Sequence, residues 1–268
     1  LQQGQAAFDE NPVGAGPFTL RSWTRQAEIE LVRNPKYWDA PKPYLDSITL
    51  RSATDTNQRY NTLTTGGADV AVETNWLNIA KARQAGLVTN TLDVGGGLFM
   101  TLNTRRPPFD DVRARQAVVA AIDIDAINQA LYNGTAELAD TLFPESSPFY
   151  SDIPLQQQDR EKAQRLFDEL AAEGKPVSFT ITAYPSTENR TTAENIQAQL
   201  SAYDNVNAEV RIVDFSQVGT LNVTHDYDTI TTGAFFQDPD PALWTAFHSQ
   251  SARNTSGIQD QELDDALL

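Results

Sequence analysis

The clearest hydrophobic pattern in the chain lies within residues 98–122, where a two-residue alternation gives way to a three- and four-residue repeat. The alternating side chains are Leu98, Met100 and Leu102 on one side and Phe99, Thr101 and Asn103 on the other. This is the period of a strand with two different faces. Pro107 and Pro108 end the strand, and Asp110 or Asp111 can cap the helix that follows. The stretch therefore predicts a strand, a rigid corner and a helix.

Short elements separated by turns are predicted before this stretch. The expected strands are residues 18–23, 27–32, 48–51, 69–72 and 88–94, and the expected helices are residues 55–63 and 76–85. The first two strands form a hairpin around three polar residues, and Thr54 or Asp55 can cap the first helix. Three glycines at 95–97 are expected to form a flexible boundary, because no phosphate-binding pattern or helix follows them.

Strands alternate with helices in the second half of the chain. The expected strands are residues 177–183, 208–213 and 227–232, the expected helices begin at residues 123 or 125, 159, 191, 216 and 262, and residues 142–154 are irregular. The first of these helices is expected to turn Ile124, Ile127 and Leu131 inward. Such alternation predicts an α/β fold with a mostly parallel sheet. Small ligands bind these sheets at the carboxyl ends of the strands, which here are residues 183–185 and 231–238.

Composition narrows the classes of partner. The net charge of −16 disfavours nucleic acid and anionic lipid, because both partners would be repelled. The acidic residues are spread along the chain, which favours a role in solubility. A hydrophobic content of 40%, without an apolar run of about 20 residues, indicates a globular protein that does not cross a membrane. The chain has no cysteine, which excludes disulfides and thiolate metal sites.

Candidate catalytic groups are few. Asp238 and Asp240 form a carboxylate pair around Pro239. Paired carboxylates can act as general acid and base. An alternative function is therefore a hydrolase or lyase that acts on a carbohydrate through Asp238, Asp240 or Asp228. The Asp-Pro sequence is also ordinary turn chemistry. His225 and His248 lack partners at metal-ligand spacing. The sequence therefore predicts no enzyme, no metal site and no cofactor.

The residues of the predicted corner also carry a family resemblance. The run from Asn103 to Ala117 reads N-T-x-x-P-P-F-D-D-V-R-x-R-Q-A and closely resembles the signature of the family 5 extracellular solute-binding proteins. Six further matches occur in order at residues 14–18, 33–38, 43–46, 59–60, 67–70 and 238–240. Members of this family are dipeptide-, oligopeptide- and nickel-binding receptors of ABC importers.

The resemblance implies a two-lobe, periplasmic-binding-protein-like fold of type II, cluster C. Residues 1–97 would be the middle of lobe one and residues 98–268 most of lobe two, so the chain is expected to be part of a longer protein. It also implies a monomeric, extracytoplasmic receptor, periplasmic or a cell-surface lipoprotein, with a peptide or other small solute and a membrane permease as partners. A sensory or chaperone-like binding protein of the same fold is a further alternative.

The ligand site is expected beside the strand that precedes Asp238. In the peptide-binding relatives this segment carries an aspartate for the ammonium group of the peptide, but here that position falls on Phe235 or a neighbour, and residues 231–237 contain no acid. Burying an unpaired ammonium costs several kcal/mol, more than the roughly 1.5–3 kcal/mol gained by burying an aromatic ring. Either an acid from another segment supplies the contact or the ligand lacks an ammonium group. The predicted ligand-binding residues are Asn103, Tyr184, Thr232, Gly233, Ala234, Phe235 and Phe236, with core packing as the alternative for the two phenylalanines.

Overall fold

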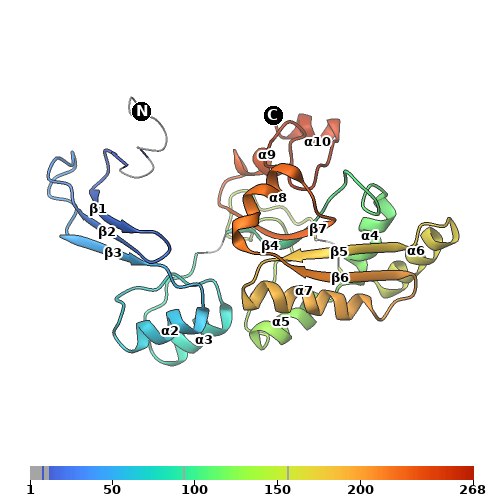
Figure 1. Cartoon of the computed structure of the whole chain (residues 1–268), viewed down its shortest axis with the longest axis horizontal. Coiled ribbons are helices and arrows are strands. Elements are labelled where there is room, and N and C mark those ends of the chain that lie inside the picture. The colour runs from blue at the N-terminus through green and yellow to red at the C-terminus, as the bar shows by residue number, and fades with distance from the viewer. Residues whose placement is uncertain (1–7, 9–11, 93, 156) are drawn as a thin grey trace. The chain divides into compact units, whose positions relative to one another are not determined.

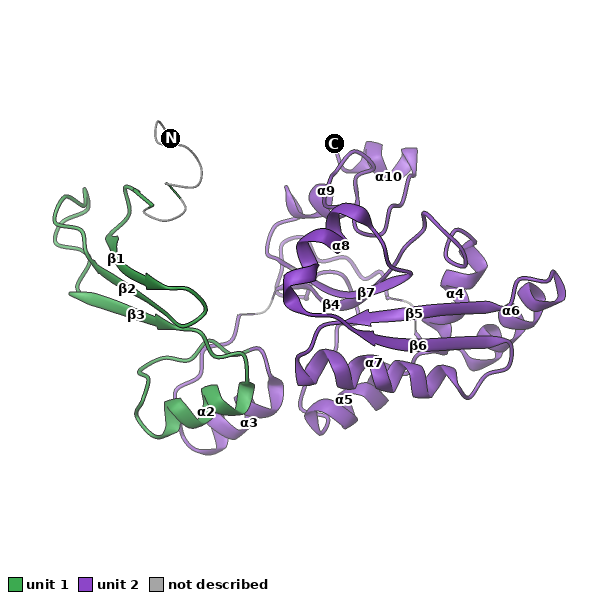
Figure 2. Ribbon diagram, in the orientation of Figure 1, with its two compact units in different colours: residues 1–73 green, residues 74–268 purple. Residues whose placement is uncertain are grey.

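The computed structural model describes residues 8, 12–92, 94–155 and 157–268. Its contacts divide the chain into two compact units, residues 1–73 and 74–268 (Figure 2). The division differs from the predicted lobe boundary between residues 97 and 98, which falls inside a strand, Gly95–Leu102. That boundary concerns the lobes of a longer protein and stays a prediction.

The first unit contains an antiparallel meander and one helix. Its strands are β1 (Phe18–Thr24), β2 (Glu28–Arg33) and β3 (Ser47–Arg51), paired in the order β1-β2-β3, and its helix is α2 (Thr56–Thr64). The predicted hairpin is confirmed, as is the N-cap, because the Asp55 side chain accepts the N–H of Gln58. Ion pairs between Arg21 and Glu30 and between Arg51 and Glu28 join neighbouring strands.

The second unit is built on a four-stranded sheet with the order β4-β7-β5-β6 (Figure 1). Its strands are β4 (Gly95–Leu102), β5 (Val177–Ala183), β6 (Val206–Ile212) and β7 (Thr229–Phe236). β5 runs parallel to both β6 and β7, whereas β4 runs antiparallel to β7. The predicted mostly parallel sheet is therefore confirmed.

The second unit also contains helices before, between and after its strands. They are α3 (Trp76–Gln84), α4 (Val112–Ala121), α5 (Ile124–Tyr132), α6 (Arg160–Ala172), α7 (Thr187–Leu200), a 3₁₀ turn η1 (Phe215–Gln217), α8 (Val218–Thr224), α9 (Ala242–Phe247) and α10 (Gln261–Ala266). Asp111, Asp123 and Asp159 cap α4, α5 and α6 by accepting backbone N–H groups of the first turn, as the sequence predicts. These start signals are local, so the sequence alone narrowed each to one or two residues. The expected start of α7 at residue 191 is wrong, because Ser186 caps a helix that begins at Thr187.

The main hydrophobic core lies between the sheet and helices α4, α6 and α7. Phe109, Val118, Phe167 and Ile181 are all fully buried there. A smaller cluster around Leu221, Tyr227 and Ile230 lies on the opposite face of the sheet. Thr229 and Thr231 pair with Leu102 and Met100, which pack against the main core. Ile230 lies between these two threonines, so its side chain points to the other face.

The corner between β4 and α4 is fastened by a buried ring and an ion-pair cluster. Phe109 is 0% exposed, and its ring packs edge-on against that of Phe179, with ring centroids 4.9 Å apart. Arg113 binds the carboxylate of Asp111 at 2.8 Å and that of Glu173 at 2.6 Å. The hydrogen bond from Arg113 lowers the pKa of Asp111 from 3.8 to about 2, and the pKa of Glu173 is lowered for the same reason. The first turn of α4 is thereby tied to the end of α6.

Two predicted strands are wrong. Residues 69–72 and the described residues between 88 and 94 form no strand, while residue 93 lies outside the described residues. Val70, Val72 and Val88 are 79%, 85% and 101% exposed, so these apolar side chains have no core to face. A strand needs a partner for its backbone groups, and β-branched residues alone do not supply one.

The expected inward position of Ile124 is also wrong, since this side chain is 51% exposed.

The glycines at 95–97 begin β4 rather than forming a flexible boundary. A Cβ atom on Gly95 would lie 2.8 Å from the ring of Phe236 and 2.9 Å from that of Phe143. The glycine is therefore required because two aromatic rings approach the backbone closely. The three glycines suggested a flexible segment, whereas Gly95 is explained by close packing that leaves no room for a side chain.

Replacing Phe109 by Ala should destabilise the chain by about 3–5 kcal/mol, because a fully buried ring is lost and the corner cannot close over the cavity. The measurement is the free energy of unfolding in urea. Val223→Ala, at a side chain that is 80% exposed, is the control and should change that energy by no more than about 0.5 kcal/mol. Equal effects of the two substitutions would contradict the assigned core.

Asp111→Asn should flatten the dependence of stability on pH between about pH 4 and pH 2. The pKa of Asp111 is lower in the folded chain than its usual 3.8, so its contribution is present above that value and is lost as pH falls towards 2. Asparagine retains the helix cap but cannot titrate. The free energy of unfolding measured across this range tests the effect. Asp110→Asn is the control, because Asp110 contacts Arg115 through its backbone carbonyl, and an equally flattened profile there would contradict the assignment.

Candidate functional site

β7 extends beyond its neighbour β5 at the carboxyl end of the sheet. β5 pairs with β7 only at Ile181 with Thr229 and at Thr182 with Ile230. On its other side, β7 pairs with β4 along its whole length, up to Phe236 with Gly95. Residues 231–236 of β7 therefore have β4 on one edge and no paired strand on the other within the described chain. The result is a two-stranded ribbon with an open edge.

The register shows which backbone groups face this open edge. Asn103 donates its N–H to the carbonyl of Asp228 at 2.9 Å, which makes this a hydrogen-bonded pair continuous with the β4–β7 register. Since hydrogen-bonded and non-hydrogen-bonded pairs alternate in an antiparallel ladder, Gly233 and Phe235 direct their N–H and C=O groups away from β4. The pair formed by Gly96 and Phe235 is accordingly not hydrogen-bonded across the ladder, because the N–H of Gly96 points outward and donates to the carbonyl of Leu142.

The two candidate phenylalanines lie on opposite faces of β7. Phe236 is buried and meets Phe143 edge-on at 5.3 Å, so core packing describes this residue. Phe235 is 59% exposed and lies beside the open edge. The alternation of side chains along a strand produces this difference. The sequence could not separate the two rings, because the register was unknown.

The remaining strand candidates occupy the same ribbon. Thr232 is half-buried opposite Phe99, and Gly233 is exposed opposite Leu98. Ala234 pairs with Gly97, while its side chain lies outside what the structure describes. Their contact with a ligand stays a prediction. Leu98, which the sequence identified only as a strand residue, joins this region through the register.

Tyr184 follows β5 at the predicted carboxyl end of the sheet. Its ring stacks on that of Phe215, with centroids 5.5 Å apart and planes inclined at 21°. Burial raises the pKa of the Tyr184 hydroxyl, which stays neutral at physiological pH. Phe215 remains 51% exposed. The pair therefore offers a partly open aromatic surface at the carboxyl end of β5.

Asn103 has a structural role. It is 1% exposed, and its amide nitrogen donates to the carbonyls of His225 and Tyr227 at 3.1 and 2.8 Å. Its side-chain oxygen accepts the N–H of Arg105 at 3.2 Å. These bonds use both amide protons and hold the start of the corner against the segment before β7. The predicted contact of Asn103 with a ligand stays a prediction.

The carboxylates of the hydrolase alternative are engaged in local structure. Asp238 accepts the backbone N–H of Asp240 at 3.0 Å, which is the geometry of an Asx turn, and both side chains are exposed. Asp228 accepts the N–H of Thr180 and forms an ion pair with Arg106 at 2.9 Å. Nothing in the part of the chain that the structure describes favours a hydrolase.

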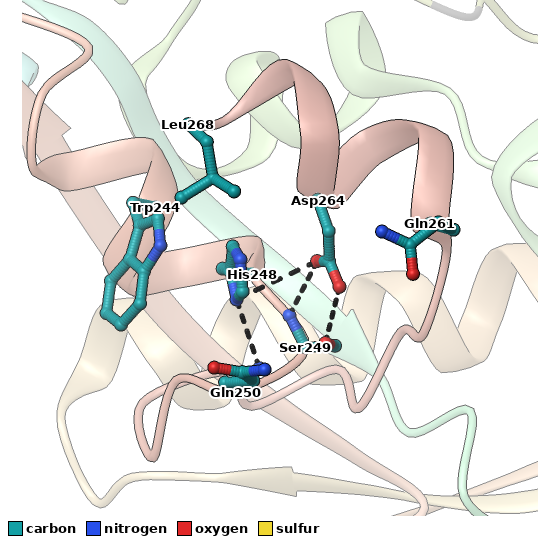
Figure 3. A pocket seen from close by; sticks show the side chains of 7 residues that line it. All are labelled: Trp244, His248, Ser249, Gln250, Gln261, Asp264 and Leu268. Carbon is teal, nitrogen blue, oxygen red and sulfur yellow. Dashed lines mark hydrogen bonds and ion pairs between the residues drawn. The ribbon is translucent and has the colours of Figure 1, made fainter.

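A separate shallow pocket lies between α9 and α10 (Figure 3). In it, His248 stacks on Trp244 with centroids 4.9 Å apart and accepts the backbone N–H of Gln250 on Nδ1. Asp264 accepts both the N–H and the hydroxyl of Ser249, and these hydrogen bonds lower its pKa. Because the Ser249 hydroxyl donates to Asp264 instead of His248, the three residues do not form a nucleophile and base pair. They join α9 to α10.

The described residues lack two features that would bear on function. They contain no group of three or more His, Cys, Asp or Glu side chains placed to hold a metal ion. None of the helices formed by the described residues combines the length and apolar character that a membrane crossing requires.

Comparison with known proteins identifies relatives along most of the chain. Residues 2–254 match the family described as bacterial extracellular solute-binding proteins, family 5 Middle. A probable di/tripeptide-binding protein 5 of Pseudomonas aeruginosa is 29% identical over 252 residues, covering 91% of this chain and 47% of the relative. The dipeptide-binding protein of Escherichia coli is 30% identical over 245 residues, covering 87% and 44%. The chain thus spans about half the length of these relatives.

The fold is shared with a solved structure. The periplasmic binding protein DppA of Helicobacter pylori, in complex with the peptide STSA, has a TM-score of 0.81 and 26% sequence identity, covering 96% of this chain and 51% of that one. This match confirms the predicted type II periplasmic-binding-protein fold, of which the chain comprises a part. With a family match that extends over nearly all of its residues, the chain belongs to the family 5 bacterial extracellular solute-binding proteins.

Proposed function

We propose that this chain forms the solute-contacting part of an extracytoplasmic receptor of an ABC importer. The receptor binds a short peptide, or another solute with a peptide-like backbone, and releases it unchanged. Family membership supports the receptor role, and the peptide-binding names of the relatives support the class of solute. A membrane permease is the partner that this role requires. No observation favours a sensory or chaperone-like role over transport.

The open edge of β7 carries this proposal. Gly233 and Phe235 each present one donor and one acceptor there, two residues apart along an extended strand, which is about 6.6–6.8 Å. An extended peptide has the same spacing between alternate residues and can add to such an edge as a further strand. The main chain of the bound peptide then supplies affinity that does not depend on the sequence of the peptide.

Transport by such a receptor needs no covalent chemistry. It needs a ligand that binds the transport-competent conformation more tightly than the ligand-free one, because a ligand with equal affinity for two states shifts neither. Hydrogen bonds to the edge of β7 can form in both conformations, so the requirement is met by the further contacts that a second surface makes when it closes over the ligand. The free energy of those contacts then favours the closed form.

The test compares Gly233→Pro with Gly233→Ala in the full-length protein. Both substitutions add a Cβ atom, but only proline removes the N–H that faces the open edge. The probe is the tetrapeptide Ser-Thr-Ser-Ala with an acetylated amino end and an amidated carboxyl end, so that it carries no ammonium group. Proline should weaken probe binding, measured by calorimetry, about tenfold more than alanine, because a ligand carbonyl loses its donor.

Hydrogen exchange gives an independent measurement of the same contact. Binding of the probe should slow exchange of the amides of Gly233 and Phe235 in the unsubstituted protein. Residues 218–224, the helix α8, provide the internal control and should be unaffected. Equal affinities of the proline and alanine variants, together with unchanged exchange in β7, would overturn the proposed mode of binding.

A further inference from the structure

We propose that Leu98 and Phe235 form an apolar subsite over Gly233 that receives an uncharged, aromatic or branched aliphatic side chain of the solute. The inference rests on the proposed function, because the backbone of the solute must first pair with the edge of β7. It goes further by assigning a side-chain preference to this chain.

The register places both side chains on one face of the ribbon. Leu98 pairs with Gly233, and Gly96 pairs with Phe235, so Leu98 and Phe235 are diagonal neighbours across β4 and β7. A Cβ atom on Gly233 would lie 3.1 Å from Cδ2 of Leu98 and 3.2 Å from Cε2 of Phe235. Both side chains therefore approach the glycine, Leu98 from the neighbouring strand and Phe235 from two residues along β7.

Gly233 is required here by space and not by backbone conformation. Its φ angle lies outside the left-handed region that favours glycine. Any larger residue would meet the ends of Leu98 and Phe235 and displace them. Without a side chain, two apolar groups can lie against the backbone at the point where the N–H and C=O of Gly233 emerge. Hydrogen-bonding groups and apolar surface are thus brought together at one position.

The two side chains are open to an incoming group. Leu98 is 64% exposed and Phe235 is 59% exposed, although both lie within the paired β4–β7 ribbon. Phe236, on the opposite face, shows how an aromatic ring of this strand behaves when a partner is present, since it is buried against Phe143. Leu98 and Phe235 lack such a partner among the described residues.

The chemistry of the occupant follows from the surrounding residues. Residues 231–237 contain no charged side chain, so a charged group placed over Gly233 would lose hydration without gaining an ion pair from this segment. A strand added to β7 directs alternate side chains to the same face as Leu98 and Phe235. One side chain of an extended solute therefore lies over Gly233, and burial of Leu98 and Phe235 favours an apolar one.

The experiment measures side-chain preference in the full-length protein. The probes are acetylated, amidated Ser-Thr-Ser-Ala and four derivatives with phenylalanine at each position in turn. At least one derivative should bind about tenfold more tightly than the parent peptide, by calorimetry, because an added ring becomes buried. Phe235→Ala should reduce this preference to less than threefold, where the preference is the ratio of the affinities for the phenylalanine derivative and the parent peptide in the same variant. Phe235→Leu should retain most of the preference.

A matched control and separable outcomes complete the test. Val223→Ala removes another exposed apolar side chain, on α8, and should leave the preference intact. If the parent peptide binds but phenylalanine brings no preference, or the preference survives in Phe235→Ala, the subsite is overturned while the proposed function stands. If none of the five peptides binds, the proposed function fails, and the subsite with it.

Discussion

The pairing of β4 with β7 is the interaction on which the rest of this structure depends. It joins residues that are more than 120 positions apart, and it continues past β4 into the bond between Asn103 and Asp228. One end of this ladder places Asn103 where it can hold the corner before α4. The other end extends beyond β5 and gives β7 its open edge. A single register thus positions both the buried corner and the candidate ligand site.

Local signals made much of the fold predictable. The sequence assigned Asp159 as a cap and narrowed the caps of α4 and α5 to two candidates each, because a cap acts within one turn of its helix. The residues of the corner predicted the family, which comparison confirms. Strands were less predictable, since Val70 and Val72 have the residue type of a strand but no partner. A strand is a property of two segments, and a single sequence does not say which two.

In the candidate site, too, local features could be predicted from the sequence and features that depend on strand pairing could not. Residues 231–238 were predicted as a ligand-binding edge from the order of strands and helices, and β7 does end there. The roles of neighbouring residues could not be predicted, because they depend on the register. Phe235 and Phe236 are identical in type and adjacent, yet one is exposed and the other buried. Leu98 belongs to the region only because the ladder sets it opposite Gly233.

An unpaired strand edge with exposed apolar side chains also invites association between copies of the chain. Proteins commonly prevent this by placing a lysine, a proline or a bulge on the edge, but each device would also block an added strand of ligand. Residues 231–236 contain none of these residues or irregularities. The net charge of −16 offers protection of another kind, since molecules of like charge repel one another before their edges can meet. Colloidal repulsion, spread over the whole surface, can thus leave the binding strand itself uncharged.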